Sequence, residues 1–166
     1  MKKLIPYNRI THAAKQNAKA INKLYKKQEQ PLVLVAVLGG SVMWLSELMK
    51  HITVPCEVDF VKVKSYRDNK QGELEWKLKP SLELKDKNVV IVEDIVDTGI
   101  TLKSVVQYIY TEYNPNSIKT CSMLLREGCE ANPTFFGYRV AKDAYVVGFG
   151  LDDKEYNRNK PDIYEL

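Results

Sequence analysis

Residues 89–102 read VVIVEDIVDTGITL, and this stretch decides the fold. Its first four residues are all β-branched and apolar, which predicts a strand buried on both faces, as in a parallel sheet. The carboxylates Glu93 and Asp94 follow, and then the polar segment DTGIT at 97–101. Apolar residues at helical spacing from Leu102 to Tyr110 predict a helix. A strand, a polar loop and a helix in this order place ligands at the carboxyl end of a parallel sheet.

The rest of the chain repeats this alternation of strands and helices. We expect helices over residues 8–27 and 42–52, and strands over 32–38, 54–65, 73–78, 117–125, 134–140 and 145–151. The alternation predicts a single α/β domain over residues 1–166, with a mostly parallel central sheet flanked by helices and a projecting hairpin with a polar tip. Residues 1–6 read as a short basic lead and residues 152–166 as a polar tail.

Four expected strands end in glycine, hydroxyl or acidic residues, namely Gly39, Ser65, Glu93 and Asp152. Because the carboxyl ends of parallel strands meet at one edge of a sheet, we expect these residues to converge there. This convergence is stronger evidence for a site than any single motif.

Composition restricts the kind of partner. The net charge of +4 suits an anionic small substrate and is too dispersed to predict nucleic-acid binding. The three cysteines lack metal-ligand spacing, and with no visible signal peptide they indicate reduced thiols in the cytoplasm. The longest uncharged run, 30–46, falls short of the roughly 18 apolar residues of a membrane span, so we expect no membrane segment.

The segment at 97–101 has two readings. Backbone N–H groups at a helix N-terminus, the hydroxyls of Thr98 and Thr101, and the permissive Gly99 would bind a phosphate. Alternatively, Asp97 or Thr98 only caps the helix.

The acid pair and the glycine pair each have two readings as well. Glu93 and Asp94 suit ribose hydroxyls, or Mg²⁺ held with them, although one could instead pair with a lysine while the other is solvated. The Gly39–Gly40 turn lets backbone N–H groups approach an anion, or merely connects two elements.

A family resemblance bears on these alternatives. The segment VEDIVDTGITL resembles the phosphoribosyl pyrophosphate (PRPP) signature of type I phosphoribosyltransferases, and the chain is most similar to the hypoxanthine-guanine branch of that family. VLGGS at 37–41 resembles the family's pyrophosphate loop, and VKSY at 63–66 its flexible loop. YVVGFGLD at 145–152 resembles the purine-binding strand, and EYNR at 155–158 the C-terminal arginine segment.

The resemblance implies the type I fold with a small hood, and a Mg²⁺-dependent transfer of phosphoribose from PRPP to a 6-oxopurine. It implies that Glu93 and Asp94 bind the ribose and a magnesium ion, and that Asp152 binds a second one. It implies a cytoplasmic homodimer or homotetramer. The remaining implied substrate-binding positions are Leu38, Gly39, Gly40 and Arg158 for pyrophosphate, Asp97, Thr98, Gly99, Ile100 and Thr101 for the 5′-phosphate, Ser65 and Tyr66 in the flexible loop, and Tyr145, Val146 and Asp152 for the base.

Asp97 matches the family's general base, which handles the proton at purine N7, so the resemblance makes it the catalytic residue. The chain departs from the family at two places. Gly39 stands where the pyrophosphate loop usually has Lys, which removes a side chain and keeps the backbone donors. Glu127 stands where a Lys usually donates to the 6-oxo group, with Arg126 beside it.

The second departure keeps the choice of base open. An ionised carboxylate cannot donate a hydrogen bond, so we expect Arg126 to supply the donor. If Glu127 instead accepts from an exocyclic amine, the base would be adenine, and xanthine also stays open. A different class of function is a PRPP-sensing regulator that binds RNA through a basic face. Lysines gather at 2–3, 15–27 and 77–87, but the match to the purine strand and Asp97 favour catalysis.

Overall fold

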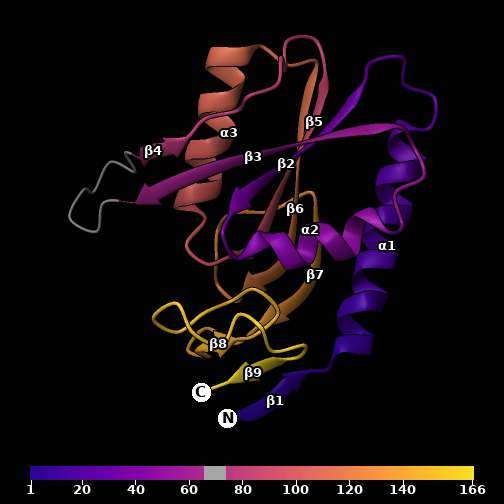
Figure 1. Cartoon of the computed structure of the whole chain (residues 1–166). Helices are drawn as coiled ribbons and strands as arrows, with labels where there is room; N and C mark the ends of the chain where they lie inside the picture. The colour runs from indigo at the N-terminus through magenta and orange to yellow at the C-terminus, as the bar shows by residue number, and fades with distance from the viewer. Residues whose placement is uncertain (66–73) are drawn as a thin grey trace.

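The computed structural model describes residues 1–65 and 74–166, and a six-stranded sheet forms its centre (Figure 1). The tip of the expected hairpin, with Tyr66, lies outside these residues. In spatial order the strands are β4 (Leu74–Leu78), β3 (Cys56–Ser65), β2 (Leu32–Leu38), β5 (Asn88–Val96), β6 (Ser117–Arg126) and β7 (Phe135–Val140). Only the β3–β4 pair is antiparallel within the described part of this sheet. The predicted α/β fold with a mostly parallel sheet is therefore confirmed.

Helices cover both faces of the sheet (Figure 1). On one face lie α1 (Tyr7–Tyr25) and α2 (Ser41–Met49), whose apolar residues join those of β2, β5 and β6 in one core cluster. On the other face α3 (Ile100–Tyr113) packs with the alternate residues of the same strands. Because successive side chains of a strand point to opposite faces, β2 and β5 supply both clusters, which explains their continuous apolar sequence.

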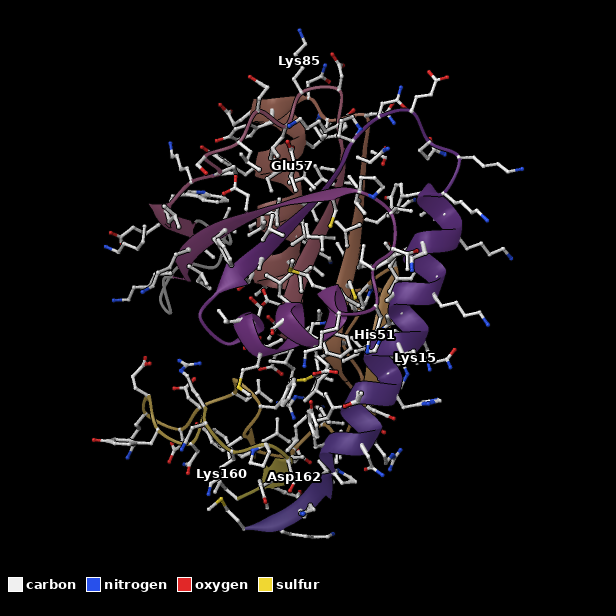
Figure 2. All side chains as sticks on the ribbon, turned by 45° about the vertical axis from the view of Figure 1, so that its right-hand side comes forward. Lys15, His51, Glu57, Lys85, Lys160 and Asp162 are labelled. Carbon is white, nitrogen blue, oxygen red and sulfur yellow. The ribbon has the colours of Figure 1, made fainter. Side chains whose placement is uncertain are left out.

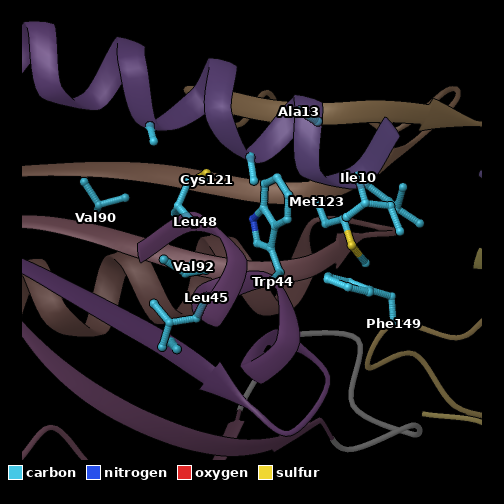
Figure 3. Close-up of a cluster of buried hydrophobic side chains, with 14 of the residues drawn as sticks. Ile10, Ala13, Trp44, Leu45, Leu48, Val90, Val92, Cys121, Met123 and Phe149 are labelled. Carbon is cyan, nitrogen blue, oxygen red and sulfur yellow. The ribbon is translucent and has the colours of Figure 1, made fainter. Parts of the chain in front are cut away.

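Trp44 anchors α2, the helix that follows β2. Its indole is fully buried between α1 and the sheet, among Ile10, Leu48 and Met123 (Figure 3). Burying a side chain of this size fixes how α2 lies on the sheet. The loop that connects β2 to α2 is thereby held at the carboxyl edge of the sheet.

The structure corrects two expectations about the strands. β5 does not end before the acid pair but continues to Val96, because Glu93, Ile95 and Val96 pair with residues of β6. The expected strand over 145–151 does not join the main sheet. Only Val146–Val147 (β8) is extended, because Gly148, Phe149 and Gly150 all have positive φ and turn the chain.

The N-terminal lead and the C-terminal tail are also more ordered than expected. Lys2–Ile5 (β1) and Ile163–Glu165 (β9) pair with each other, and β9 pairs with β8, which gives a three-stranded hood. Asp162, seen at the foot of the molecule in Figure 2, holds the hood to the body: it forms an ion pair of 2.6 Å with Lys3 and accepts the Tyr7 N–H at 2.8 Å. The hydrogen bond from Lys3 and the Tyr7 N–H lower the pKa of Asp162.

Across the described residues, no helix combines the length and the apolar character needed to cross a membrane.

Candidate active site

A cavity of about 450 Å³ opens at the carboxyl ends of β2 and β5. It brings together eleven of the positions implicated by the sequence: Leu38, Gly39, Gly40, Glu93, Asp94, Asp97, Thr98, Gly99, Thr101, Asp152 and Arg158. The expected convergence of strand ends is thus observed for β2 and β5, with Val63 of β3 at the margin. Asp152 also reaches the cavity, although it comes from the turn after β8 and not from a strand of the main sheet.

Three further positions, Arg126, Tyr145 and Val146, are outside the lining of the cavity, as is Ile100, which is half exposed at the start of α3. Ser65 ends β3, and its side chain is outside the described residues. A larger hollow of about 900 Å³ runs along α3 beside Trp76 and Tyr108. It is mainly apolar and has none of the phosphate-loop or acid-pair residues, so the chemistry belongs to the smaller cavity.

The loop at Leu38–Gly40 lies tightly against the acid pair, and the Leu38–Gly39 peptide bond is cis. A Cβ on Gly40 would lie 1.5 Å from Oδ2 of Asp94, and one on Gly150 would lie 2.0 Å from the Gly40 carbonyl oxygen. The absence of side chains therefore lets three segments meet: the β2–α2 loop, the end of β5 and the C-terminal turn. The backbone of residues 38–40 therefore lies next to Asp94, and would also lie next to a ligand bound by the acid pair.

The acid pair is buried without a cation. Glu93 is 8% exposed, and Asp94 is half-buried beside it. Burial and the charge of Asp94 raise the pKa of Glu93 well above its usual range, and burial also raises the pKa of Asp94, which the charge of Arg158 opposes. Neither carboxylate forms an ion pair with a described residue. The lysine pairing considered from sequence is therefore absent from the described structure, and the pair is suited to a ligand that supplies hydroxyls or positive charge.

The loop before α3 is open to the cavity. Gly99, in the left-handed conformation with φ 81°, is the N-cap of α3, and no side chain caps the helix by a hydrogen bond. Of the two readings of this segment, the one in which Asp97 or Thr98 is the N-cap residue is not observed, because Gly99 occupies that position; Thr98 Oγ1 accepts the Ile100 N–H at 3.4 Å. A Cβ on Gly99 would lie 2.3 Å from that of Ala131, so this backbone fits closely against the loop after β6. A helix N-terminus left without a side-chain cap is a favourable position for an anion.

Arg158 is held beside the acids by the C-terminal turn. Its Nη2 lies 2.9 Å from Oδ1 of Asp152 and 3.0 Å from Oε2 of Glu155, and its Nη1 donates to the Gly150 carbonyl at 2.7 Å. Asp152 also accepts the Glu155 N–H, at 2.8 Å. The cavity is therefore lined by the guanidinium of Arg158 as well as by carboxylates, as a ligand with both hydroxyl and anionic groups requires.

Arg126 and Asp97 form an ion pair that sequence reasoning missed, with Nε 2.8 Å from Oδ1. The structure explains the contact: Val96 and Leu125 lie opposite each other in the parallel β5–β6 ladder, so the residues that follow them emerge side by side. The sequence pattern does not give this register. Tyr145, which follows the turn at Ala144, is 54% exposed, and its hydroxyl lies 3.3 Å from Asp153 Oδ1. Loss of solvent and the neighbouring Asp153 raise the pKa of Tyr145.

The donors fit magnesium only in part. No group of three or more His, Cys, Asp or Glu side chains among the described residues is arranged to hold a metal ion. Glu93 and Asp94 on one side and Asp152 on the other therefore do not make a closed metal cage. Mg²⁺, however, commonly uses one or two carboxylates and takes its other ligands from water and substrate phosphates. The buried pair that lacks a cation fits an ion that arrives with its substrate.

Comparisons with known proteins agree with this geometry. A model of the phosphoribosyl transferase domain matches residues 6–154. A curated hypoxanthine-guanine phosphoribosyltransferase from Aquifex aeolicus is 33% identical, over 99% of this chain and 93% of its own. The crystal structure of a hypoxanthine phosphoribosyltransferase from Staphylococcus aureus has a TM-score of 0.92 and 32% identity, covering 99% of this chain and 90% of its own.

A third relative is a lysine-to-arginine mutant of the Trypanosoma cruzi hypoxanthine phosphoribosyltransferase, in complex with the product IMP. It has a TM-score of 0.92 and 32% identity, with coverage of 100% of this chain and 90% of its own. The fold, the cavity at the strand ends and the full-length similarity lead to one conclusion: the chain belongs to the phosphoribosyltransferase family.

Proposed function

We propose that the protein transfers the phosphoribosyl group of PRPP to a 6-oxopurine, hypoxanthine or guanine, and releases IMP or GMP and pyrophosphate in purine salvage. The observation that carries this proposal is the cavity in which a buried acid pair, an open helix N-terminus and an arginine face one another. Its volume of about 450 Å³ suits a small polar ligand. The relatives named for hypoxanthine-guanine transfer, and the one bound to IMP, support the choice of base.

PRPP would use the three sides of the cavity for its three polar parts. The ribose hydroxyls would donate to Glu93 and Asp94, which replaces the water these acids have lost. The 5′-phosphate would bind at residues 97–101, before the first turn of α3. The pyrophosphate would lie against the backbone of residues 38–40 and the guanidinium of Arg158.

Glu93 and Asp94 would hold one Mg²⁺ ion together with PRPP, and Asp152 would hold a second. When bound, magnesium supplies positive charge that stabilises the departing pyrophosphate. Arg158 would contribute in the same direction, because its guanidinium contacts Asp152, its charge acts on Asp94, and it can neutralise charge that grows on the leaving oxygen. To do so it exchanges part of its contact with Asp152 or Glu155 for the phosphate.

The base would bind on the far side of Asp97, under the hood. The exposed ring of Tyr145 offers a stacking surface, and the backbone of Val146 and Asp152 can read the edge of the purine. Purine N9 forms the new bond to C1′ as the bond from C1′ to pyrophosphate breaks, and the proton at N7 passes to Asp97. Asp97 suits this task because its carboxylate is exposed to the site and held in place by Arg126.

The decisive assay incubates the purified protein with PRPP, Mg²⁺ and each of hypoxanthine, guanine, xanthine and adenine, and follows nucleotide formation by chromatography. We expect IMP or GMP, with loss of product when Mg²⁺ is chelated. Turnover of adenine alone contradicts the 6-oxopurine assignment. RNA retention that weakens with salt, without any phosphoribosyl transfer, favours the RNA-binding regulator instead.

We also propose that the protein forms a homodimer or homotetramer, as its family resemblance implies. Light scattering coupled to size exclusion tests this directly: a mass of 19.1 kDa, that of a single chain, contradicts it.

A further inference from the structure

Asp162, at the lower end of the molecule in Figure 2, joins the last part of the chain to its beginning. Its carboxylate accepts the Tyr7 N–H at 2.8 Å and the Tyr164 hydroxyl at 3.0 Å, and lies 2.6 Å from Lys3 Nζ. Tyr7 is the first residue of α1, and the N-cap residue Pro6 contributes no side-chain hydrogen bond. Because a first-turn N–H has no acceptor within its own helix, Asp162 serves as the cap of α1 from 155 positions away.

The bond to the start of α1 is the contact that matters most for this anchor. The Lys3 side chain is 53% exposed, and an ion pair that is open to solvent contributes little free energy. The Tyr7 N–H, by contrast, belongs to the fixed backbone of a helix and meets a buried side chain. A residue at position 162 that keeps an acceptor for this N–H should therefore keep the anchor.

The main chain of Asp162 supports the turn at residues 148–150. A Cβ on Gly148 would lie 2.1 Å from the Asp162 carbonyl oxygen, so the two backbones are in direct contact. The Phe149 N–H donates to the Lys160 carbonyl at 2.8 Å, which continues the same contact along the chain. The position of the turn therefore follows the position of Asp162.

The far end of this turn forms one side of the cavity. The Gly150 N–H donates to the Arg158 carbonyl at 2.9 Å, and the Gly150 carbonyl accepts Nη1 of the same arginine at 2.7 Å. A Cβ on Gly150 would lie 2.0 Å from the Gly40 carbonyl oxygen, so the turn also touches the loop at 38–40. The turn thus connects Asp162 to both groups that are proposed to hold the pyrophosphate of PRPP.

Resting on the proposed function, we propose that Asp162 is a positioning residue for the pyrophosphate group of PRPP. Its side chain fixes the C-terminal segment to α1, its main chain fixes the turn at 148–150, and that turn fixes Arg158 and the loop at 38–40. Asp162 is not among the described residues that line the cavity, so it acts only through these contacts. Small displacements of positioned groups are enough to weaken binding and catalysis.

The segment proposed to hold the base has separate support. β8 pairs with β9 through the main chain, and the Leu166 N–H donates to the Tyr145 carbonyl at 3.0 Å. These contacts do not use the side chain of Asp162. We therefore expect a change of that side chain to weaken the binding of PRPP more than the binding of IMP, which has no pyrophosphate.

The test compares wild type with Asp162→Ala, Asp162→Asn, Lys3→Met and Lys2→Met. Calorimetry gives the Kd of PRPP and of IMP, each with Mg²⁺, and steady-state kinetics with hypoxanthine give kcat and the KM for PRPP. For Asp162→Ala we expect the Kd and KM of PRPP to rise about tenfold or more, while kcat and the Kd of IMP stay within about threefold of wild type.

The other variants separate the contacts of Asp162. Asp162→Asn keeps an acceptor for the Tyr7 N–H, and Lys3→Met loses only the exposed ion pair, so both should stay within about threefold of wild type for PRPP. Lys2→Met changes an exposed lysine of the same strand and should match wild type in every value.

Folding is checked by the melting temperature of each variant without ligand. If Asp162→Ala does not fold, Gly148→Ala takes its place with the same expected pattern, because its methyl group would meet the Asp162 carbonyl. Unchanged PRPP affinity, an equal loss of PRPP and IMP affinity, an Asp162→Asn as weak as Asp162→Ala, or failure of both Asp162→Ala and Gly148→Ala to fold overturns the inference and leaves the proposed function intact. A wild-type protein that makes no nucleotide from PRPP with any of the four bases overturns both.

Discussion

Replacing Glu93 by Gln should stabilise the ligand-free protein at neutral pH and weaken its binding of PRPP. Glu93 is 8% exposed, next to Asp94 and without an ion pair to a described residue. Gln has nearly the same shape but needs no ionisation, so the variant avoids the cost of a buried charge. In wild type, ionising the buried Glu93 lowers the stability of the folded chain, and a ligand that supplies hydroxyls or positive charge to the acid pair would offset this loss.

The size of the effect depends on pH in a defined way. Burial and the Asp94 charge raise the pKa of Glu93 in the folded protein well above its ordinary value of 4.5. Well below pH 4.5 the Glu93 carboxyl is protonated in both the folded and the unfolded chain, so it carries no buried charge that would lower the stability of wild type. Above it, the unfolded chain ionises first, so the stability of wild type relative to the variant falls by about 1.4 kcal/mol per pH unit until the raised pKa is reached. For a chain of this size that equals roughly 3–5 °C in melting temperature per pH unit.

The assay is thermal unfolding of both proteins without ligand from pH 4.5 to pH 8. We expect the melting-temperature difference to be near zero at the acidic end, to grow in favour of Glu93→Gln as pH rises, and then to level off. Glu127→Gln changes the net charge equally at an exposed position and should show no such trend. A pH-independent difference, or a less stable Glu93→Gln at pH 7, would refute the argument from burial. Adding PRPP with Mg²⁺ should raise the melting temperature of wild type more than that of Glu93→Gln.

Three other substitutions test separate parts of the structure. Gly40→Ala places a methyl group 1.5 Å from Asp94 Oδ2 and should raise the KM for PRPP by about tenfold or more through displacement of that carboxylate; steady-state kinetics with an unchanged KM would contradict it. Asp97→Asn should lower kcat by about 10²–10⁴ with little change in KM for the base, and an unchanged kcat would remove Asp97 from the mechanism. Asp59 is buried and accepts hydrogen bonds from Phe60, Ser81 and Leu82; burial opposes its charge, but these donors together lower its pKa below 3.8. Asp59→Asn should therefore lower the free energy of unfolding, measured with urea, by about 1–3 kcal/mol at pH 7. The difference from wild type should shrink as the pH falls through the lowered pKa of Asp59, because the wild-type carboxylate is then protonated and loses the same contacts. An equal difference at every pH would contradict this prediction.

Much of the main sheet was predictable because its strands are buried on both faces. The aliphatic run at 32–38 and the β-branched run at 89–92 mark β2 and β5, and the helices that cover them have apolar residues at helical spacing. The acid pair and the phosphate loop were identifiable because polar residues at and directly after the end of such a strand must lie at the carboxyl edge. These are local patterns, and they need no knowledge of distant residues.

The hood was not predictable from local pattern, because its stability comes from pairing between the two ends of the chain. Lys2–Ile5 and Ile163–Glu165 are too short and too polar to be recognised as strands alone. Each is paired with the other, β9 is also paired with β8, and Asp162 ties Lys3 to the same place. Gly148 and Gly150, read in sequence as part of a strand, have positive φ and turn the chain toward Gly40.

The sequence by itself therefore determined the α/β class, the order of most elements in the main sheet and the residue types that surround a sugar phosphate. Tertiary structure decided which of those residues interact. Arg126 and Asp97 are 29 positions apart and meet only because β5 and β6 are parallel neighbours in register. The raised pKa of Glu93 likewise depends on the three-dimensional burial that surrounds it. Both are consequences of distance and solvent exclusion, which a linear pattern of residues does not contain.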